Sequence, residues 1–288
     1  MKLILARLLL RVLSWLPLSV IRGLGPVIGW VVWRWPGRTF GRSKQKILRQ
    51  INVAFPDLTP HEQQQLLRRN LTAMLITALE MGPVWSRSSQ WLESNIQLDA
   101  GHALDEAIRS AQGVLIVSAH LGNWEAGALY VSHRYPLVYL YKPPKSKQVH
   151  ELLIERRARF GGRFVAAGSA AMRSMIRQLR QGGTAGLMFD QLPKSGEGVD
   201  GLFFNQPVET MTLAHQLAKR TACRVFFAEC TRQAGQRGWI VRMRELPGLA
   251  ELEPAAAATV LNQTLERRII EQPEQYLWQY ERFKSSFE

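Results

Sequence analysis

From about residue 113 onward, short apolar segments alternate with helical ones, and this alternation limits what the chain can fold into. The apolar segments are continuous, which is typical of strands that are buried on both faces of a sheet. The expected strands are "GVLIVSA" (113–119), "PLVYLY" (136–141), "TAGLMF" (184–189), "RVFFAE" (224–229) and "WIVRMREL" (239–246). We therefore predict an α/β fold with a mixed, mostly parallel sheet that helices cover on both faces.

Helical patterns fill the segments between these strands and flank them. Thr59, followed by Pro60 and Glu62, predicts a helix start with a capping box and proline at the first helical position. "PKSGEGVDG" reads as a glycine-rich surface loop. The expected helices lie at 43–85, which is amphipathic, and near 125–132, 148–160, 170–181, 210–220 and 255–272.

Basic residues are in excess and are concentrated at the N-terminus. The chain has 37 Lys and Arg against 23 Asp and Glu, a net charge of +14. The first acidic residue is Asp57, and ten basic residues precede it. A basic, apolar segment without acidic residues suits an anionic lipid surface better than a nucleic acid.

The N-terminal segment has the composition of an interfacial anchor. Its longest uncharged windows, 12–21 and 23–33, are shorter than the ~20 residues that cross a bilayer. Arg7, Arg11 and Arg22 would share one side of a helix that Pro17 bends. Alternatives are a transmembrane helix with snorkelling arginines and a helical hairpin packed on the domain. Aromatic residues typical of an interface accompany the arginines: Trp15, Trp30, Trp33 and Trp35.

Two cysteines are present, Cys223 and Cys230. Their odd separation along one expected strand directs them to opposite faces of the sheet. A disulfide between them is therefore not expected, which favours a reducing compartment.

One polar pair stands out at the end of the first expected strand. In "VSAHLGNWEA", His120 ends the strand and Glu125 opens the next helix. A carboxylate bonded to one imidazole nitrogen would leave the other as a base facing the carboxyl edge of the sheet, where ligands of such folds bind. A satisfied structural pair and a metal site are the alternatives, although no second His or Cys stands at usable ligand spacing.

Several segments resemble one known family. "HLGNWE" after an apolar strand is similar to the HxxxxE motif of the bacterial late acyltransferases of lipid A biosynthesis. The resemblance runs from about 40 to 284, and its order is more specific than the short motif alone. The other matching segments are "INVAFPDLTPHEQQQLLRRN", "RSMIRQLRQGG", "FDQ" and "PEQYLWQYERFK".

The resemblance implies an enzyme that moves an acyl group from acyl carrier protein to a hydroxyl of a lipid A precursor. It places this reaction at the cytoplasmic face of the bacterial inner membrane, with His120 as general base and Glu125 as its orienting partner. No metal and no cofactor is required beyond the acyl donor. The acidic carrier protein would suit the basic surface. Residues 1–40 would be the membrane anchor and 41–288 the acyltransferase domain.

The chain departs from the family pattern where an acceptor would be recognised. The usual "YRP" reads "YKPP", with Lys142, and the usual "HRRFK" reads "YERFK", with Tyr280 and Glu281. The "DR" stretch before "MIR" reads "GSAAMRSMIR", and "vPFFG" reads "GLFFNQP". The acceptor could therefore be a related lipid.

Further candidates for substrate binding are basic and polar. Arg156, Arg159 and Arg163 would share a helix face and clamp a phosphate, preferred over Arg157; a solvated basic face is the alternative. Arg282 and Lys284 would contact lipid phosphate or lie in a solvated terminus.

Two polar residues near strand ends complete the candidate site. Asp190 would orient the substrate or basic residues, or cap a loop. Asn123, or the amides of its turn, would polarise the thioester carbonyl, with turn formation as the alternative.

Two alternative functions stay open. The acceptor could be a lysophospholipid, an aminolipid or another glycolipid. The chain could also be a basic peripheral membrane protein without catalysis. No aromatic-basic RNA motif or helix-turn-helix signature supports binding to nucleic acid.

Overall fold

The computed structural model of the protein describes residues 2–34, 38–144, 146–194, 196–233, 235 and 238–283. The helices in this part are α1 (Lys2–Trp15), α2 (Leu18–Arg34), α3 (Arg38–Ala54), α4 (Pro60–Ser86), α5 (Ser89–Ser94), α6 (Gly101–Arg109), α7 (Trp124–Arg134), α8 (Lys147–Ala158), α9 (Ser169–Arg180), α10 (Leu213–Thr221) and α11 (Pro254–Glu271), with a 3-10 turn at Pro273–Gln275. The strands are β1 (Ile96–Asp99), β2 (Val114–Gly122), β3 (Leu137–Tyr141), β4 (Arg163–Ala166), β5 (Thr184–Met188), β6 (Gly198–Phe203), β7 (Gln206–Met211), β8 (Arg224–Arg232) and β9 (Trp239–Glu245).

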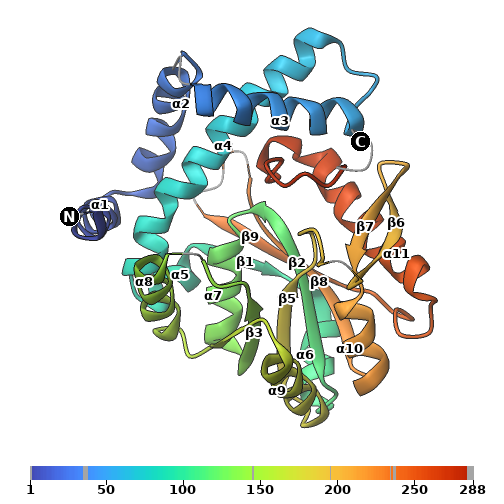
Figure 1. The fold of residues 1–288 in the computed structure, drawn as a ribbon. Helices are drawn as coiled ribbons and strands as arrows, with labels where there is room; N and C mark the ends of the chain where they lie inside the picture. The colour runs from blue at the N-terminus through green and yellow to red at the C-terminus, as the bar shows by residue number, and fades with distance from the viewer. Residues whose placement is uncertain are drawn as a thin grey trace.

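Seven of the described strands form one sheet in the order β1-β9-β8-β2-β5-β3-β4. All of its pairings are parallel except β8 with β9. Helices surround this sheet (Figure 1). The predicted α/β class, with a mixed and mostly parallel sheet covered on both faces, is confirmed.

The molecule has two hydrophobic cores, and the central strand β2 contributes residues to both. Its residues Leu115 and Val117 are buried in one core with α9, α10 and α11, whereas Val114 and Ile116 are buried in the other with α6 and α7. This two-residue period follows from the pleat of a strand, and a strand covered on both faces has no polar face. Cys223 and Cys230 likewise lie in different cores, as their spacing predicted.

A hairpin, β6 and β7, differs from the prediction for this part of the chain. Residues 198–201 of the expected glycine-rich loop form the start of β6, and Thr210 of the expected helix at 210–220 lies in β7. The hairpin closes at Phe203 and Gln206, and the two residues between them, Phe204 and Asn205, have φ of 49° and 57°. Such a turn matches the twist of paired strands.

Helix α4 crosses the edge of the sheet at which the parallel strands end (Figure 1). Its start is the predicted capping box: Thr59 Oγ1 accepts from the Glu62 amide, and Glu62 Oε2 accepts from the Thr59 amide. Further along α4, Asn70 donates to the carbonyls of Glu274 and Tyr276. The C-terminal segment is thereby held beside the end of β2.

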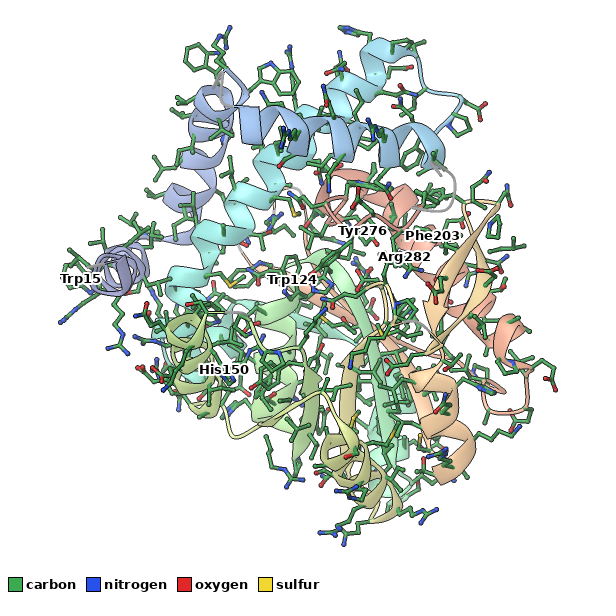
Figure 2. The ribbon with its side chains drawn as sticks, in the orientation of Figure 1. Trp15, Trp124, His150, Phe203, Tyr276 and Arg282 are labelled. Atoms are coloured by element: carbon green, nitrogen blue, oxygen red, sulfur yellow. The ribbon has the colours of Figure 1, made fainter. Side chains whose placement is uncertain are left out.

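The N-terminal helices α1 and α2 pack along α4, and both carry apolar side chains on their outer faces. Trp15 is 72% exposed and Val27 is 62% exposed, and Figure 2 shows Trp15 at the periphery of the molecule. Pro17 separates the two helices. Arg7 and Arg11 therefore belong to α1 and Arg22 to α2, whereas the prediction placed all three on one side of a single bent helix. Trp35 lies outside the described residues. None of the described helices has the length and hydropathy to cross a membrane.

Candidate active site

His120 and Asp190 lie side by side because β2 and β5 are adjacent parallel strands. The two strands pair from Val114 opposite Thr184 to Ser118 opposite Met188. Continuing this register by two residues brings His120 beside Asp190. The Asp190 side chain accepts two hydrogen bonds from His120, from the backbone amide and from ring Nδ1, each 2.8 Å long. Asp190 is fully buried and His120 is 7% exposed.

The environment of Asp190 keeps its carboxylate ionised. Burial acts to raise the pKa of Asp190, but the charge and hydrogen bonds of His120 and the charge of Arg282 outweigh it, so the pKa lies below its usual value. An ionised carboxylate accepts hydrogen bonds, so Nδ1 of His120 carries the proton. Nε2 is then an acceptor, which is the tautomer that a general base requires.

Glu125 does not contact His120, and the predicted orienting role of Glu125 is therefore wrong in this structure. The buried Glu125 carboxylate accepts from Arg157 Nε at 2.8 Å and Nη2 at 2.7 Å, and from Trp85 Nε1 at 3.0 Å. Burial acts to lower the pKa of Arg157, but the bonds and charge of Glu125 raise it above its usual value. The bidentate pair with Arg157 joins α7 to α8, and the bond from Trp85 joins α7 to α4.

The chain turns sharply at Gly122, between His120 and Glu125. Gly122 has φ of 67°, and a Cβ there would lie 2.1 Å from the Cys230 carbonyl oxygen, so only glycine fits. The chain then enters α7 at Trp124, whose ring packs edge-on against His120 with centroids 5.0 Å apart. Trp124 lies near the centre of the molecule (Figure 2).

Asn123 shapes the turn, which was the alternative to its predicted role at the thioester carbonyl. Its fully buried side chain accepts from the Ala126 amide at 3.0 Å and caps α7. The amide group donates to Glu80 Oε2 at 2.9 Å. Both ends of the side chain are therefore engaged away from His120.

Glu80 of α4 is the centre of a buried charged cluster behind this turn. Besides Asn123, it accepts from Arg22 Nε at 2.8 Å, from Arg232 Nη1 at 3.0 Å and from Trp239 Nε1 at 3.2 Å. Arg22 belongs to α2 and Arg232 to β8. The cluster therefore joins α2, the sheet and the turn after β2.

The C-terminal segment covers the other side of His120. The Leu277 amide donates to the His120 carbonyl at 2.9 Å. Tyr280 packs edge-on against the imidazole, with centroids 4.7 Å apart, and its hydroxyl lies 3.5 Å from Nε2. Gln191, which follows Asp190, donates to the same hydroxyl at 3.0 Å. The sequence pattern marked Tyr280 as a departure from the family, and the structure places it beside the base.

The predicted arginine clamp is not formed, because α8 ends at Ala158. Arg156 lies 3.7 Å from Glu155, and Arg159 donates to the carbonyls of Trp85 and Ser86 at the end of α4. Arg163 belongs to the edge strand β4 and donates to Ser174 at 2.6 Å. The three residues share no helix face, and Arg157, which the prediction set aside, is the arginine bonded to the motif glutamate.

Three other basic residues were predicted to contact substrate or lipid, and their outcomes differ. Lys142 is exposed just after β3, at the same sheet edge as His120 and Asp190, so its role in substrate binding stays a prediction. Arg282 is buried rather than solvated, donating to Asn262 at 2.8 Å and to Thr210 at 3.2 Å (its place is labelled in Figure 2). Lys284 lies outside the described residues.

The arrangement is suited to deprotonating a hydroxyl. The imidazole is held at Nδ1 by an ionised carboxylate, and in its neutral form it presents Nε2 as an acceptor beside a phenolic hydroxyl. Over the described part of the chain, no three His, Cys, Asp or Glu side chains gather in a way that could hold a metal ion.

Curated proteins similar to this chain share a common activity. The lipid A biosynthesis lauroyltransferase of Escherichia coli (strain K12) is 26% identical over 280 residues, covering 94% of this chain and 87% of the relative. The lipid A biosynthesis palmitoleoyltransferase of the same strain is 24% identical over 277 residues, with the same coverage.

Among solved structures, the 1-acyl-sn-glycerophosphate acyltransferase PlsC of Thermotoga maritima aligns with 80% of this chain and 95% of its own, at 12% identity and a TM-score of 0.38. The family model for bacterial lipid A biosynthesis acyltransferases matches residues 3–285, nearly the whole chain. The chain therefore belongs to the bacterial lipid A biosynthesis acyltransferase family and is an acyltransferase.

Proposed function

We propose that the protein transfers a fatty acyl chain from acyl carrier protein to a hydroxyl of a lipid A precursor. The acyltransferase family and the names of its relatives support the reaction class and the lipid A acceptor. The observation that carries the mechanism is the bond from His120 Nδ1 to the buried carboxylate of Asp190, because it leaves Nε2 as a base.

The proposed reaction is a direct transfer. Nε2 of His120 takes the proton of the acceptor hydroxyl as its oxygen attacks the thioester carbonyl carbon. Asp190 stabilises the imidazolium that forms. The tetrahedral intermediate collapses to the new ester, the carbon–sulfur bond breaks, and the departing thiolate takes the proton from Nε2. The imidazole is thereby restored.

We place the reaction at the cytoplasmic face of the inner membrane, with α1 and α2 as the contact to lipid. Trp15 and Val27 are exposed on these helices, and Arg11 and Arg34 lie over the rings of Trp15 and Trp30, at 6.0 Å and 4.1 Å. Exposed apolar side chains next to arginines suit a surface of anionic lipid. The excess of positive charge also suits an acidic carrier protein.

The test uses the full chain, purified in detergent, with labelled acyl-acyl carrier protein and a purified lipid A precursor. Wild type should form the acylated lipid, and His120→Ala should reduce the rate to background while the variant still unfolds in one cooperative thermal transition. Mass spectrometry of the product reports which hydroxyl is acylated. Transfer by His120→Ala at the wild-type rate would remove His120 from the mechanism.

A second acceptor class is favoured by Tyr280, because this departure from the family pattern lies against the base. A lysophospholipid, an aminolipid or another glycolipid should be offered in parallel with the lipid A precursor. Preference for one of them, with the same dependence on His120, would change the acceptor and keep the chemistry.

A further inference from the structure

The hydroxyl of Tyr280 is placed to act on the second substrate of the proposed reaction. It lies 3.5 Å from Nε2 of His120, at the nitrogen where the acceptor hydroxyl must bind. Of the polar side chains in the described residues, it is the one found this close to Nε2. The carbonyl carbon under attack must come within about 3–3.5 Å of the acceptor oxygen. The Tyr280 hydroxyl and the thioester carbonyl would therefore both lie close to Nε2 of His120.

The proton of the Tyr280 hydroxyl is uncommitted apart from the long contact to Nε2. Gln191 Nε2 donates to the phenolic oxygen at 3.0 Å, so the oxygen serves as an acceptor there. The phenolic hydrogen must then point elsewhere, and Nε2 at 3.5 Å is its partner in the structure. When an acceptor hydroxyl is hydrogen-bonded to Nε2, the phenolic hydrogen of Tyr280 becomes available to the carbonyl oxygen of the thioester.

Four other donors near His120 are already engaged. The His120 amide donates to Asp190, and the Asn123 amide donates to the Cys230 carbonyl at 2.7 Å. The Asn123 side chain donates to Glu80, and the Leu277 amide donates to the His120 carbonyl. Asn123, which the sequence predicted as a donor to the thioester carbonyl, is therefore bound elsewhere.

The environment keeps Tyr280 protonated at neutral pH. Burial, and then the negative charge of Asp190, raise the pKa of Tyr280 above its usual value, against a smaller opposing effect from the bond of Gln191. A neutral phenol at neutral pH is a donor. Two consecutive residues in the segment after β5 therefore have separate roles: Asp190 orients His120, and Gln191 orients Tyr280.

We propose that Tyr280 is a catalytic residue whose hydroxyl donates a hydrogen bond to the oxyanion of the tetrahedral intermediate, with Gln191 as its positioning residue. This proposal rests on the proposed acyl transfer. The phenol keeps its proton throughout, so it stabilises the charge that develops on the carbonyl oxygen and takes no part in the proton transfer.

The first test compares Tyr280→Phe with Tyr130→Phe. Tyr130 is a matched control because its hydroxyl is bonded to Arg134 within α7, away from the base. Tyr280→Phe should lower kcat by about 10²–10³-fold with KM within about twofold of wild type. Tyr130→Phe should leave both constants unchanged. A kcat for Tyr280→Phe within threefold of wild type would mean that the ring only covers His120, and would overturn the proposal.

A second test does not depend on turnover. An alkylphosphonate analogue of acyl-pantetheine carries a tetrahedral anion in place of the carbonyl, and calorimetry measures its binding. Tyr280→Phe should weaken this binding by about the factor lost in kcat, whereas binding of the ground-state thioester should not change. Equal analogue affinity in wild type and Tyr280→Phe refutes the role of Tyr280 even if no acceptor lipid is acylated.

The two proposals fail in different ways. His120→Ala retaining transfer contradicts the proposed base and leaves the analogue result to decide on Tyr280. Gln191→Leu should reduce kcat in wild type but not further in Tyr280→Phe, because it acts through the same hydroxyl. Additive losses in the double variant would show that Gln191 does not position Tyr280.

Discussion

Asp190 accepts two hydrogen bonds from a single residue, His120, one from its backbone amide and one from its ring, both 2.8 Å long. One carboxylate therefore fixes both the backbone at the end of β2 and the tautomer of the base. The glutamate of the HxxxxE motif has neither role in this structure, since Glu125 is bonded to Arg157 and Trp85.

Asp190→Asn should reduce kcat strongly with little change in fold. The amide is isosteric but no longer fixes the proton on Nδ1, so we expect a loss of about 10²–10⁴-fold. Steady-state kinetics of acyl transfer measure it. Glu125→Gln is the matched control and should lose much less; a larger loss in Glu125→Gln than in Asp190→Asn would restore the motif glutamate as the partner of the base.

Breaking the pair of Glu125 and Arg157 should affect stability. Glu125→Leu leaves a largely buried guanidinium unpaired, so the free energy of unfolding should fall by about 3–5 kcal/mol. The double variant Glu125→Leu/Arg157→Met removes both charges and should recover much of this loss. Urea denaturation of the two variants measures the coupling, and equal losses would show that the pair does not contribute.

The dependence of stability on pH should report Asp190. Its pKa is lower in the folded protein than its usual value of 3.8. Its contribution to stability is therefore complete above pH ~4, and it is lost as the pH falls through the lower folded value. Denaturation should be measured between about pH 2.5 and pH 7, an interval that includes the usual pKa of a carboxyl group. The free energy of unfolding of wild type should fall more steeply with acidification than that of Asp190→Asn. Parallel profiles would contradict the assignment.

Vesicle binding should depend on the outer face of α2. Val27→Ser removes an apolar side chain that is 62% exposed, and Ile270→Ser removes one that is 55% exposed on α11. With vesicles containing phosphatidylglycerol, Val27→Ser should bind about three- to tenfold more weakly, and Ile270→Ser should bind like wild type. Equal effects of the two substitutions in a sedimentation assay would argue against α2 as the lipid contact.

The sequence predicted five of the seven described strands of the sheet because these strands carry their signal locally, whereas the edge strands β1 and β4 were not predicted. Continuous apolar runs such as 113–119 and 184–189 need no knowledge of their neighbours, and both became strands of the sheet. The hairpin of β6 and β7 was missed because its turn residues, Phe204 and Asn205, lack the glycine that usually marks such turns. The glycines of β6 favoured a loop instead.

The partner of the base depended on which strands are neighbours. His120 and Asp190 each follow an expected strand by one residue, so each was predicted to lie at the carboxyl edge of the sheet. The sequence does not state that these two strands are adjacent, and the nearer carboxylate, Glu125, was chosen. The order of strands decided the outcome, because adjacency of β2 and β5 brings Asp190 within bonding distance.

The carboxylate of Glu80 accepts hydrogen bonds from Arg22 of the second N-terminal helix and from Asn123 of the turn that follows His120. A terminal leader that merely moored an enzyme would be dispensable for its chemistry. Here, removing α2 would deprive the buried Glu80 carboxylate of the charge of Arg22, so the helices proposed to contact lipid and the turn after His120 depend on the same carboxylate.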